Sequence, residues 1–352
     1  MVNVALLGCG RIALRHAELL GLGHIKGARL CSVCDIDEGK AKQFGEKYGV
    51  NHYTKIEEMM AAEKKIDVIS ILTPSGLHAS HTFTLAPYKK HIIVEKPMAL
   101  TLEDADEMIR VCDENGIKLF VIKQNRYNLP VQKLKNTLES GRFGKLVMGT
   151  VRVRWCRTQE YYDQDEWRGT WAMDGGVFTN QASHHVDLLE WMMGDVESVF
   201  AKSATQLVDV EVEDTGVAVL KFKNGALGII EATTATRPKD LEGSLSILGE
   251  NGSVEIGGFA VNAIRSWQFK DANAEDEIIK KDFSTNPPDV YGYGHKAYYE
   301  HVVDCIENNG KALVDGLEGR RSLELIMAIY ESIETGEEVF LRFTPKKCRL
   351  GH

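Results

Sequence analysis

The stretch that decides the fold runs from residue 4 to residue 13 and reads VALLGCGRIA. Its first four residues are apolar, as in a buried strand, and a glycine turn follows them directly. Gly8 permits the tight turn, Gly10 lets the backbone approach a pyrophosphate, and Ala13 is small enough for close packing of a helix on the strand. A second apolar run ends at Asp35, about twenty residues past the turn, which is the spacing of a dinucleotide-binding fold.

The same stretch predicts which cofactor binds. A lone glycine turn of this kind also occurs without a ligand, but here strand, turn, helix, second strand and terminal acid are in register. The helix directs its unpaired N–H groups and the positive end of its dipole toward the phosphates. The carboxylate of Asp35 can bond to a ribose diol and would repel a 2′-phosphate. We therefore expect a nicotinamide- or flavin-nucleotide site, with NAD favoured over NADP, at Gly8, Gly10, Arg11, Ile12 and Asp35.

Strands and helices alternate as far as residue 122. Apolar runs at 67–72 and 91–94 predict two further buried strands, and a helix suits the residues from His78 onward. This alternation predicts a doubly wound parallel sheet, an α/β Rossmann domain, over residues 1–122. In such sheets ligands collect at the carboxyl ends of the strands. The residues expected to join the glycine turn in one crevice are Thr73, Pro74, His78, Glu95 and Lys96.

The pattern changes after residue 122. Runs with strand character follow, several joined by glycine-containing turns such as Lys223-Asn224-Gly225. These runs are 145–156, 196–205, 214–222, 227–234, 243–248 and 252–256. Helical patterns occur before, between and after them. We expect residues 123–345 to form an α/β domain for substrate binding and oligomerisation, with an open, mostly antiparallel sheet, and residues 346–352 to be a loosely held tail.

Composition limits the class of protein. The chain has 352 residues, 43% of them hydrophobic and 26% charged, as expected for an ordinary globular protein with two domains. The formal net charge of −9 argues against a nucleic-acid partner. No apolar run approaches the ~20 residues of a membrane-spanning helix, so neither a membrane span nor a signal peptide is expected. Seven scattered cysteines fit reduced thiols and predict a cytoplasmic location.

Lys96 is the first candidate for chemistry. It follows a strand end and precedes Pro97, which fixes the local backbone. A lysine at the lip of a crevice can hold a substrate hydroxyl and favour its alkoxide, or it can shuttle a proton if burial lowers its pKa. The alternative is a surface lysine that pairs with Glu95.

The second candidate lies in residues 174–187, which read DGGVFTNQASHHVD. The glycines open a loop, and the remainder enters a helix on which Asn180, His184 and Asp187 share a face. A histidine with an acid and an amide beside it can take a hydroxyl proton near neutral pH. The alternative is a core histidine capped by Asp187. The spacing of these residues and His185 offers no tight pair of metal ligands, so no metal is expected.

A local excess of positive charge lies between Val121 and Arg157. This segment holds nine basic residues and one acid, Glu139, in a chain that is acidic overall. It would steer an anion such as a nucleotide-linked or carboxylated sugar, although most of its charges are expected to be solvated. Lys123 and Arg126 are favoured as ligands of the anion because they lie just past a strand end.

An aromatic-rich loop follows this basic segment. Its rings suit stacking on a sugar or a base, and the alternative is that half of them belong to the core or to an interface. The residues of the loop are Tyr161, Tyr162, Trp167, Arg168 and Trp171.

Together these features resemble the Gfo/Idh/MocA oxidoreductase family over nearly the whole chain. The resemblance rests on Gly8-Cys9-Gly10 with Asp35, Thr73-Pro74 with His78, Glu95-Lys96-Pro97, and the glycine segment that ends in His184 and Asp187. It implies a nicotinamide-binding domain and an α/β domain whose open sheet makes dimers, often within tetramers. It also implies hydride transfer at a sugar or cyclitol carbon, with Lys96 and His184 as the proton-handling pair. Many members carry an aspartate where this chain has Asn180, and an amide could orient the substrate but could not ionise.

Within the family, residues 123–128, 157–162 and 180–184 are similar to a group of dehydrogenases of surface-polysaccharide synthesis. That group oxidises the 3-hydroxyl of UDP-N-acetylglucosaminuronate with NAD. The similarity adds His295, near a helix start, as a candidate substrate contact. The expected substrate-binding residues are then Lys123, Arg126, Tyr161, Tyr162, Asn180 and His295. Two other functions stay open: a dehydrogenase or reductase of a free sugar or inositol, and a nucleotide-binding regulator without turnover.

Overall fold

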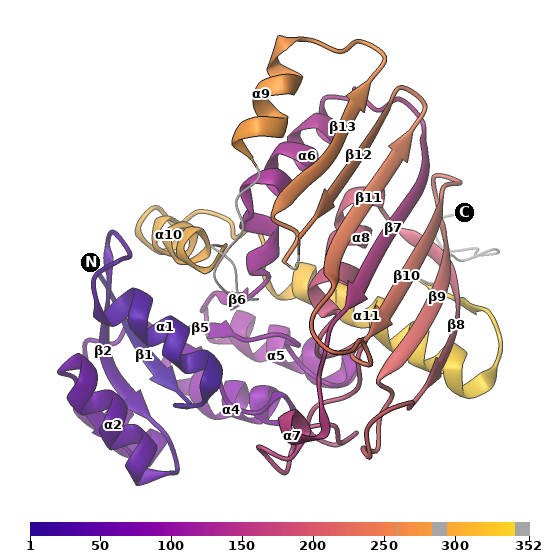
Figure 1. The fold of residues 1–352 in the computed structure, drawn as a ribbon. Helices are drawn as coiled ribbons and strands as arrows, with labels where there is room; N and C mark the ends of the chain where they lie inside the picture. Colours follow the sequence, from indigo (N-terminus) through magenta and orange to yellow (C-terminus); the bar gives the residue numbers. More distant parts are fainter. Residues whose placement is uncertain (259, 284–293, 342–352) are drawn as a thin grey trace, which may run out of the picture.

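The computed structural model describes residues 1–258, 260–283 and 294–341, which fold around two separate β-sheets (Figure 1). The first sheet has six strands in the order β3-β2-β1-β4-β5-β6, and the second has eight in the order β13-β12-β11-β7-β10-β9-β8-β14. None of the helices in the described part of the chain is both long and apolar enough to span a membrane.

Every pairing in the first sheet is parallel, as the alternating pattern predicts. Its strands are β1 (Val2–Leu7), β2 (Ala28–Cys34), β3 (Asn51–Tyr53), β4 (Val68–Ile71), β5 (His91–Val94) and β6 (Leu119–Val121). The helices between them are α1 (Arg11–Gly21), α2 (Glu38–Tyr48), α3 (Ile56–Ala62), α4 (His78–Leu85) and α5 (Leu102–Glu114), with 3-10 turns η1 (Ser75–Leu77) and η2 (Ala86–Tyr88). The strand order reverses between β1 and β4, and this switch point is where a doubly wound sheet opens its ligand crevice.

The helices of the first domain begin in two different ways. Asp37 caps α2 by accepting a hydrogen bond from the backbone N–H of Lys40, and Thr101 caps α5 in the same way. α1 begins after Gly10 without any side-chain cap. Its first N–H groups therefore need another acceptor, and they lie at the switch point of the sheet.

The second sheet is mixed but mostly antiparallel, because only β7 and β10 pair in parallel. Its strands are β7 (Leu146–Arg154), β8 (Val196–Ala204), β9 (Thr215–Phe222), β10 (Leu227–Thr233), β11 (Glu242–Gly249), β12 (Gly252–Gly257), β13 (Ala263–Phe269) and β14 (Val339–Phe340). The remaining helical segments are η3 (Gln124–Tyr127), α6 (Leu129–Glu139), α7 (Gln159–Tyr162), α8 (Ser183–Met193), α9 (Ala274–Asp282), α10 (Gly294–Glu307) and α11 (Gly316–Thr335). The sequence did not predict β13, because a register shift opposite β12 breaks its alternation of buried and exposed residues.

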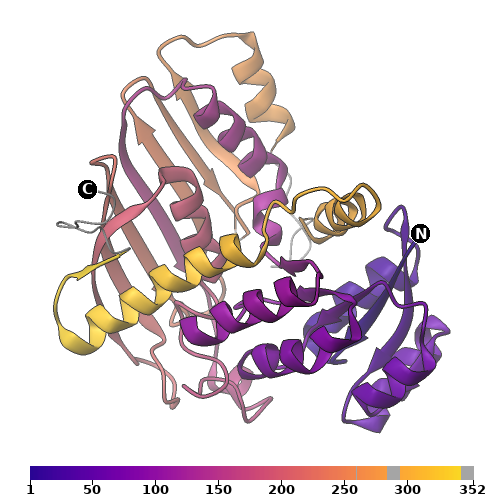
Figure 2. The same ribbon diagram turned by 180° about the vertical axis from the view of Figure 1, so that it is seen from behind.

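The two faces of the second sheet differ. Helices α6, α8 and α11 cover one face and bury its apolar side chains in a single core (Figures 1 and 2). No helix of the described residues covers the other face, and strand β9 alternates accordingly: Ala218 and Leu220 are buried, whereas Val217 and Val219 are 50% and 55% exposed. The open, mostly antiparallel sheet expected from the sequence is therefore confirmed.

Helix α10 follows the second sheet in sequence but packs with the first domain. Its residues Tyr298, Tyr299 and Val302 belong to the same core as Val4 and Leu30 of the first sheet. The chain therefore leaves the first domain after β6 and returns to it at α10. The predicted division at residues 122 and 123 stays a prediction, and residues 342–345 and the predicted tail at 346–352 lie outside the described residues.

Candidate active site

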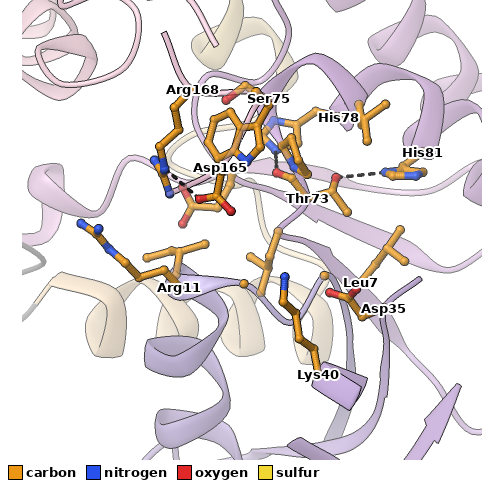
Figure 3. A pocket seen from close by; sticks show the side chains of 18 of the residues that line it. Leu7, Arg11, Asp35, Lys40, Thr73, Ser75, His78, His81, Asp165 and Arg168 are labelled. Atoms are coloured by element: carbon orange, nitrogen blue, oxygen red, sulfur yellow. Dashed lines mark hydrogen bonds and ion pairs between the residues drawn. The ribbon is translucent and has the colours of Figure 1, made fainter. Parts of the chain in front are cut away.

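A cleft of about 790 Å³ lies between the strand ends of the first domain and residues 155–184 of the second. All ten residues predicted to bind the cofactor line it: Gly8, Gly10, Arg11, Ile12, Asp35, Thr73, Pro74, His78, Glu95 and Lys96. Figure 3 shows side chains of both domains around this cleft, with Arg11 and Asp35 from the first and Asp165 and Arg168 from the second. The carboxyl ends of the strands have therefore brought the predicted motifs together.

The two glycines of the first turn have different reasons to be glycine. Gly8 has a φ of +100°, and a Cβ there would lie 2.8 Å from the backbone of Leu72. A Cβ on Gly10 would meet no protein atom within 4 Å. Packing within the chain therefore does not require glycine at position 10. Close approach of a ligand to the open N-terminus of α1 does, and a pyrophosphate fits that requirement.

The carboxylate of Asp35 is held in place at the end of β2. One oxygen accepts a hydrogen bond of 2.6 Å from the backbone N–H of Cys9, and the other accepts one of 2.9 Å from the N–H of Asp37. Each carboxylate oxygen can accept a further bond. The side chain is thus positioned to receive a ribose diol, and its charge disfavours a phosphate at the same place.

His78 joins two of the loops that line the cleft. Its ring is buried, with Nδ1 2.7 Å from the carbonyl oxygen of Pro97 and Nε2 2.9 Å from that of Thr73. The histidine therefore ties the loop after β4 to the loop after β5. Its main contribution is to position Thr73-Pro74 and Lys96-Pro97 relative to each other.

Glu95, in the wall of the cleft, is the centre of a buried network. Its Oε1 lies 3.2 Å from His16 Nε2 and 3.9 Å from His295 Nε2, and its Oε2 accepts the N–H of Lys96 at 2.9 Å. Tyr299 contacts the other nitrogen of His16 at 2.6 Å. Burial alone would raise the pKa of Glu95, but the hydrogen bonds and charges of the two histidines hold it well below its usual value. The carboxylate therefore stays ionised and fixes the backbone at Lys96.

The same network shows where His295 lies. Its ring is fully buried and contacts Glu95 and His16, and it is not part of the cleft wall. The predicted direct contact with substrate is therefore replaced by a contact with the glutamate that holds Lys96. Within the described residues, His16, Glu95 and His295 are a set of metal-ligand types whose ligand atoms lie within 4.8 Å of one another. Their mutual contacts give each side chain a role in the network without an ion.

Lys96 and His184 line the same cleft, one from each domain. The ammonium of Lys96 donates to the carbonyl oxygen of Asn180 at 2.6 Å and to its Oδ1 at 3.2 Å. An ammonium has three N–H groups, so one remains for a substrate hydroxyl. Burial lowers the pKa of Lys96, and the charges of Glu95 and Asp174 oppose that shift.

His184 is a neutral imidazole in this setting. Burial, together with the positive charges of Lys96 and Lys123, holds the pKa of His184 well below its usual value. Its buried Nδ1 makes no hydrogen bond with the described residues. The residue lines the cleft, where a neutral imidazole can accept a proton and the ammonium of Lys96 can stabilise the oxyanion that remains.

Asp187 does not cap His184, which the sequence left open as an alternative. Its two oxygens accept hydrogen bonds from Arg126 at 2.8 and 2.9 Å, and Lys123 lies 3.9 Å away. Arg126 also bonds to Glu318 at 3.1 Å. Both cations are 3% exposed and are absent from the cleft wall, so the structure does not support the predicted direct contacts with substrate. The 3-10 turn after β6 points them into the domain interior instead.

Tyr161 stands among three arginines. The guanidinium carbons of Arg11, Arg157 and Arg168 lie 5.3, 5.4 and 4.9 Å from the centre of its ring, and Arg168 also donates to its hydroxyl at 3.1 Å. All four side chains line the cleft. The neighbouring Tyr162 is buried, contacts Thr234 at 3.2 Å and does not line it, so direct substrate contact is not supported there.

Arg157 was the basic residue that sequence reasoning undervalued. The signal was its position at the end of the basic segment, four residues before Tyr161 of the loop predicted to stack on a sugar. The preference for Lys123 and Arg126 rested on their place after a strand end, and the sequence gives no sign that Asp187 would neutralise them. Asp174 and Gln181 were also missed as wall or support residues, although both belong to the quoted segment 174–187.

A glycine turn on an uncapped helix, a positioned acid, and a lysine and a histidine that meet in one cleft define a dinucleotide-dependent oxidoreductase. Two family models match the chain: one for the NAD-binding Rossmann fold of the oxidoreductase family, over residues 2–123, and one for its C-terminal alpha/beta domain, over residues 135–341. The chain therefore belongs to the Gfo/Idh/MocA oxidoreductase family, which confirms the predicted fold class and family.

Solved structures and other relatives are similar to the chain over nearly its whole length. The WlbA dehydrogenase from Chromobacterium violaceum, in complex with NADH and UDP-GlcNAcA, is 44% identical, with 98% of this chain and 97% of that chain covered and a TM-score of 0.90. The WlbA dehydrogenase from Bordetella pertussis, with the same two ligands, is 41% identical, with 97% and 98% covered and a TM-score of 0.90. The myo-inositol 2-dehydrogenase of Thermotoga maritima is 27% identical over 97% of this chain and 98% of its own.

Proposed function

We propose that the chain is an NAD-dependent dehydrogenase that oxidises the 3-hydroxyl of a nucleotide-linked sugar uronate such as UDP-N-acetylglucosaminuronate, in the synthesis of surface polysaccharide. Two relatives at 41% and 44% identity bind NADH and UDP-GlcNAcA. The observation in this chain that carries the proposal is the group of three arginines around Tyr161 in the wall of the cleft. A substrate with a diphosphate and a carboxylate is the kind of anion that such a wall favours.

The positive charge of this wall is only partly neutralised by the protein. Arg157 pairs with Asp240 at 3.0 Å and Arg168 with Asp165 at 2.9 Å, and both acids are about a third exposed. A guanidinium bound on one edge still has N–H groups for an anion. Arg157 and Arg168 are nearly buried, so a substrate anion beside them would be shielded from competing water and salt.

The proposed reaction removes a hydride from the carbinol carbon and a proton from its hydroxyl, which leaves a ketone. NAD held by the glycine turn and Asp35 would supply the hydride acceptor. Lys96 donates its remaining N–H to the hydroxyl oxygen and stabilises negative charge as it develops there. His184, neutral because burial and two lysines disfavour its charged form, takes the proton. Lys96 itself is the alternative acceptor if it enters the reaction deprotonated.

A panel assay tests the function. Formation of NADH is followed with UDP-N-acetylglucosaminuronate, with UDP-N-acetylglucosamine, which keeps the diphosphate but lacks the carboxylate, and with free glucuronate and myo-inositol. We expect turnover with the nucleotide uronate and at least about 10²-fold lower kcat/KM with the nucleotide sugar that lacks the carboxylate, because the nearly buried Arg157 and Arg168 would lose an anionic partner. Arg157→Gln and Arg168→Gln should each raise the KM for the uronate about 10-fold or more and leave the KM for NAD unchanged, whereas Arg29→Gln on the surface should change neither.

The second candidate is a dehydrogenase of a free polyol, favoured by the similarity to myo-inositol 2-dehydrogenase. The same panel separates the two: turnover of free inositol or a free sugar with none of any UDP-sugar would replace the first proposal. NAD binding without turnover of any member, together with a Lys96→Ala variant that behaves as wild type, would instead support a nucleotide-binding regulator.

We further propose that the open face of the second sheet binds a second copy of the chain and that the enzyme works in the cytoplasm, where NAD and nucleotide sugars are formed. The face carries exposed apolar side chains, including Phe200, Val217, Val219 and Leu227. A contiguous apolar surface of this kind is typical of subunit contacts. Light scattering should show a dimer or a tetramer, and Val219→Lys should reduce the mass toward that of the monomer.

A further inference from the structure

A chain of hydrogen bonds connects Lys96 to a buried acid of the second domain. Lys96 Nζ donates to Asn180 Oδ1 at 3.2 Å, and Asn180 Nδ2 donates to Asp174 Oδ1. The other oxygen of Asp174 accepts the backbone N–H of Gly169 at 2.9 Å. Asp174 is 1% exposed, does not line the cleft, and has no part in the reaction described above.

The donors and acceptors along these hydrogen bonds fix the orientation of the Asn180 amide. Both partners of Asp174 donate, so its ionised form satisfies them and a protonated oxygen would face another donor. The amide of Asn180 must then turn its nitrogen toward Asp174, which leaves its oxygen for Lys96. If the amide were reversed, its N–H groups would face an ammonium. The carboxylate of Asp174 therefore decides which atom Lys96 meets.

We propose that Asp174 is a positioning residue of the reaction: acting through the amide of Asn180, its carboxylate aims the ammonium of Lys96 into the cleft and keeps it charged. This inference rests on the proposed function for its catalytic consequence, but not for its effect on Lys96. Asn180 cannot ionise, so it transmits to Lys96 the effect of the Asp174 carboxylate, which lies on the other side of the amide.

The charges around Lys96 make Asp174 important. Burial disfavours the charged form of Lys96, and the positive charges of Lys123 and Arg168 add to that effect. His184, in the same cleft, is neutral and offers no negative charge. The charges of Glu95 and Asp174 act in the opposite direction. Glu95 bonds to the backbone N–H of Lys96 and is shared with His16. Asp174 is the acid whose influence reaches the ammonium through a hydrogen-bonded side chain.

The geometry offers a swap that separates this role from a purely structural one. In Asp174→Asn, no orientation of the new amide satisfies both Gly169 N–H and Asn180 Nδ2, because both donate. In the double variant Asp174→Asn with Asn180→Asp, the amide oxygen accepts from Gly169, the amide nitrogen donates to the new carboxylate, and that carboxylate accepts from Lys96. The swap therefore restores every hydrogen bond and returns one negative charge to Lys96.

Two measurements test the proposal. Competitive labelling of Lys96 with acetic anhydride over a range of pH, read by mass spectrometry, gives the titration midpoint of this lysine without any substrate. We expect the midpoint to fall by about one pH unit or more in Asp174→Asn and to return to at least the wild-type position in the swap. In the pH profile of kcat/KM, the limb that reports the titration of Lys96 should move in the same way. We also expect kcat to be about 10-fold or more lower in the single variant and to recover in the swap.

The outcomes are distinguishable. An unchanged labelling midpoint in a folded Asp174→Asn protein, or a midpoint that the swap fails to restore, overturns the proposal. If the single variant does not fold, the swap is compared with wild type: the proposal then requires a midpoint equal to or above that of wild type, and a lower one overturns it. Absence of wild-type turnover with every UDP-uronate would overturn the proposed function alone, because the labelling result does not depend on substrate.

Discussion

The wall of the cleft from the first domain and the wall from the second hold their side chains by different means. In the first domain, Gly8, Asp35 and Glu95 each lie directly after a parallel strand, and backbone N–H groups hold the carboxylates of Asp35 and Glu95 at 2.6 to 2.9 Å. In the second domain, Tyr161 and Asn180 lie on a long segment between β7 and α8. Contacts with residues distant in sequence, such as Asp240 and Glu213, hold that segment.

This difference separates the binding of cofactor from the choice of substrate. Strand ends of a buried sheet give fixed positions that suit a ligand shared by many enzymes. A segment held by side-chain contacts can change its residues without changing the sheet behind it. We therefore expect variants of the first wall to affect NAD or the chemical step for every substrate. Variants of the second wall, apart from the proton acceptor His184, should affect one substrate against another.

Lys96→Met should have the largest effect. The variant keeps an apolar stem but loses the ammonium that contacts Asn180 and the substrate hydroxyl. We expect kcat to fall about 10³-fold or more, because both oxyanion stabilisation and proton handling are lost. NADH binding, measured by fluorescence titration, should change less than about threefold. Lys65→Met on the surface is the control, and a loss of less than tenfold in the Lys96 variant would contradict the assigned role.

His184→Gln should come next, with kcat about 10²-fold lower. Burial and the charges of Lys96 and Lys123 lower the pKa of His184, so protonation of the ring inactivates the enzyme only below the usual histidine range. In Lys123→Met one of these positive charges is gone, the pKa of His184 rises, and the acid limb of the kcat/KM profile should move to higher pH.

The neighbouring His185 provides a control for this prediction. It is fully buried, packs edge-on against Trp155, and does not line the cleft. His185→Gln, assayed below its melting temperature, should keep most of the activity. If both histidine variants lose activity equally, or if the limb does not respond to Lys123→Met, His184 is not the proton acceptor.

The same contrast explains what the sequence could predict. Gly8, Asp35, Thr73 and Lys96 are read from spacing, because each lies at a strand end and parallel strand ends meet at one edge. Lys123 also follows a strand, but its side chain is neutralised by Asp187, a partner 64 positions away that no local pattern reveals. The arginines around Tyr161 depend on the docking of one domain against the other. That docking is a property of the whole fold, and local sequence does not encode it.

Asp35→Asn should have an intermediate effect that is confined to the cofactor. The amide keeps an acceptor for the N–H of Cys9 but loses the charge that receives a ribose diol and repels a 2′-phosphate. We expect the KM for NAD to rise about tenfold and the ratio of kcat/KM values for NADP over NAD to rise by more than that. Glu38→Gln, at an exposed position three residues farther along the chain, should leave both unchanged. A change in the KM for the sugar, with the KM for NAD unchanged, would contradict the assignment of Asp35 to the cofactor.

The smallest effect on catalysis is expected at Glu213, which supports the second wall from behind. Its carboxylate accepts the N–H of Phe178 at 3.1 Å and the hydroxyl of Tyr330 at 2.9 Å. It also lies so close to Gly176 that a Cβ there would be 1.9 Å from its Oε2. Burial raises the pKa of Glu213 to about 7, although these hydrogen bonds oppose the shift. The support of the second wall therefore titrates near neutral pH.

The sign of its effect on stability follows from linkage. The folded state binds this proton more tightly than the unfolded state, so the free energy of unfolding falls as the pH rises from about 4.5 to about 7, and it stays lower above that range. Glu213→Gln removes this term, which is worth at most about 3 kcal/mol for such a shift. Denaturant unfolding at pH 5 and pH 8 should show a smaller decrease in stability for the variant than for wild type, with kcat changed less than about twofold. The exposed Glu211→Gln should keep the wild-type pH dependence, and a Glu213 variant that also keeps it would show that the buried carboxyl is already ionised at pH 5.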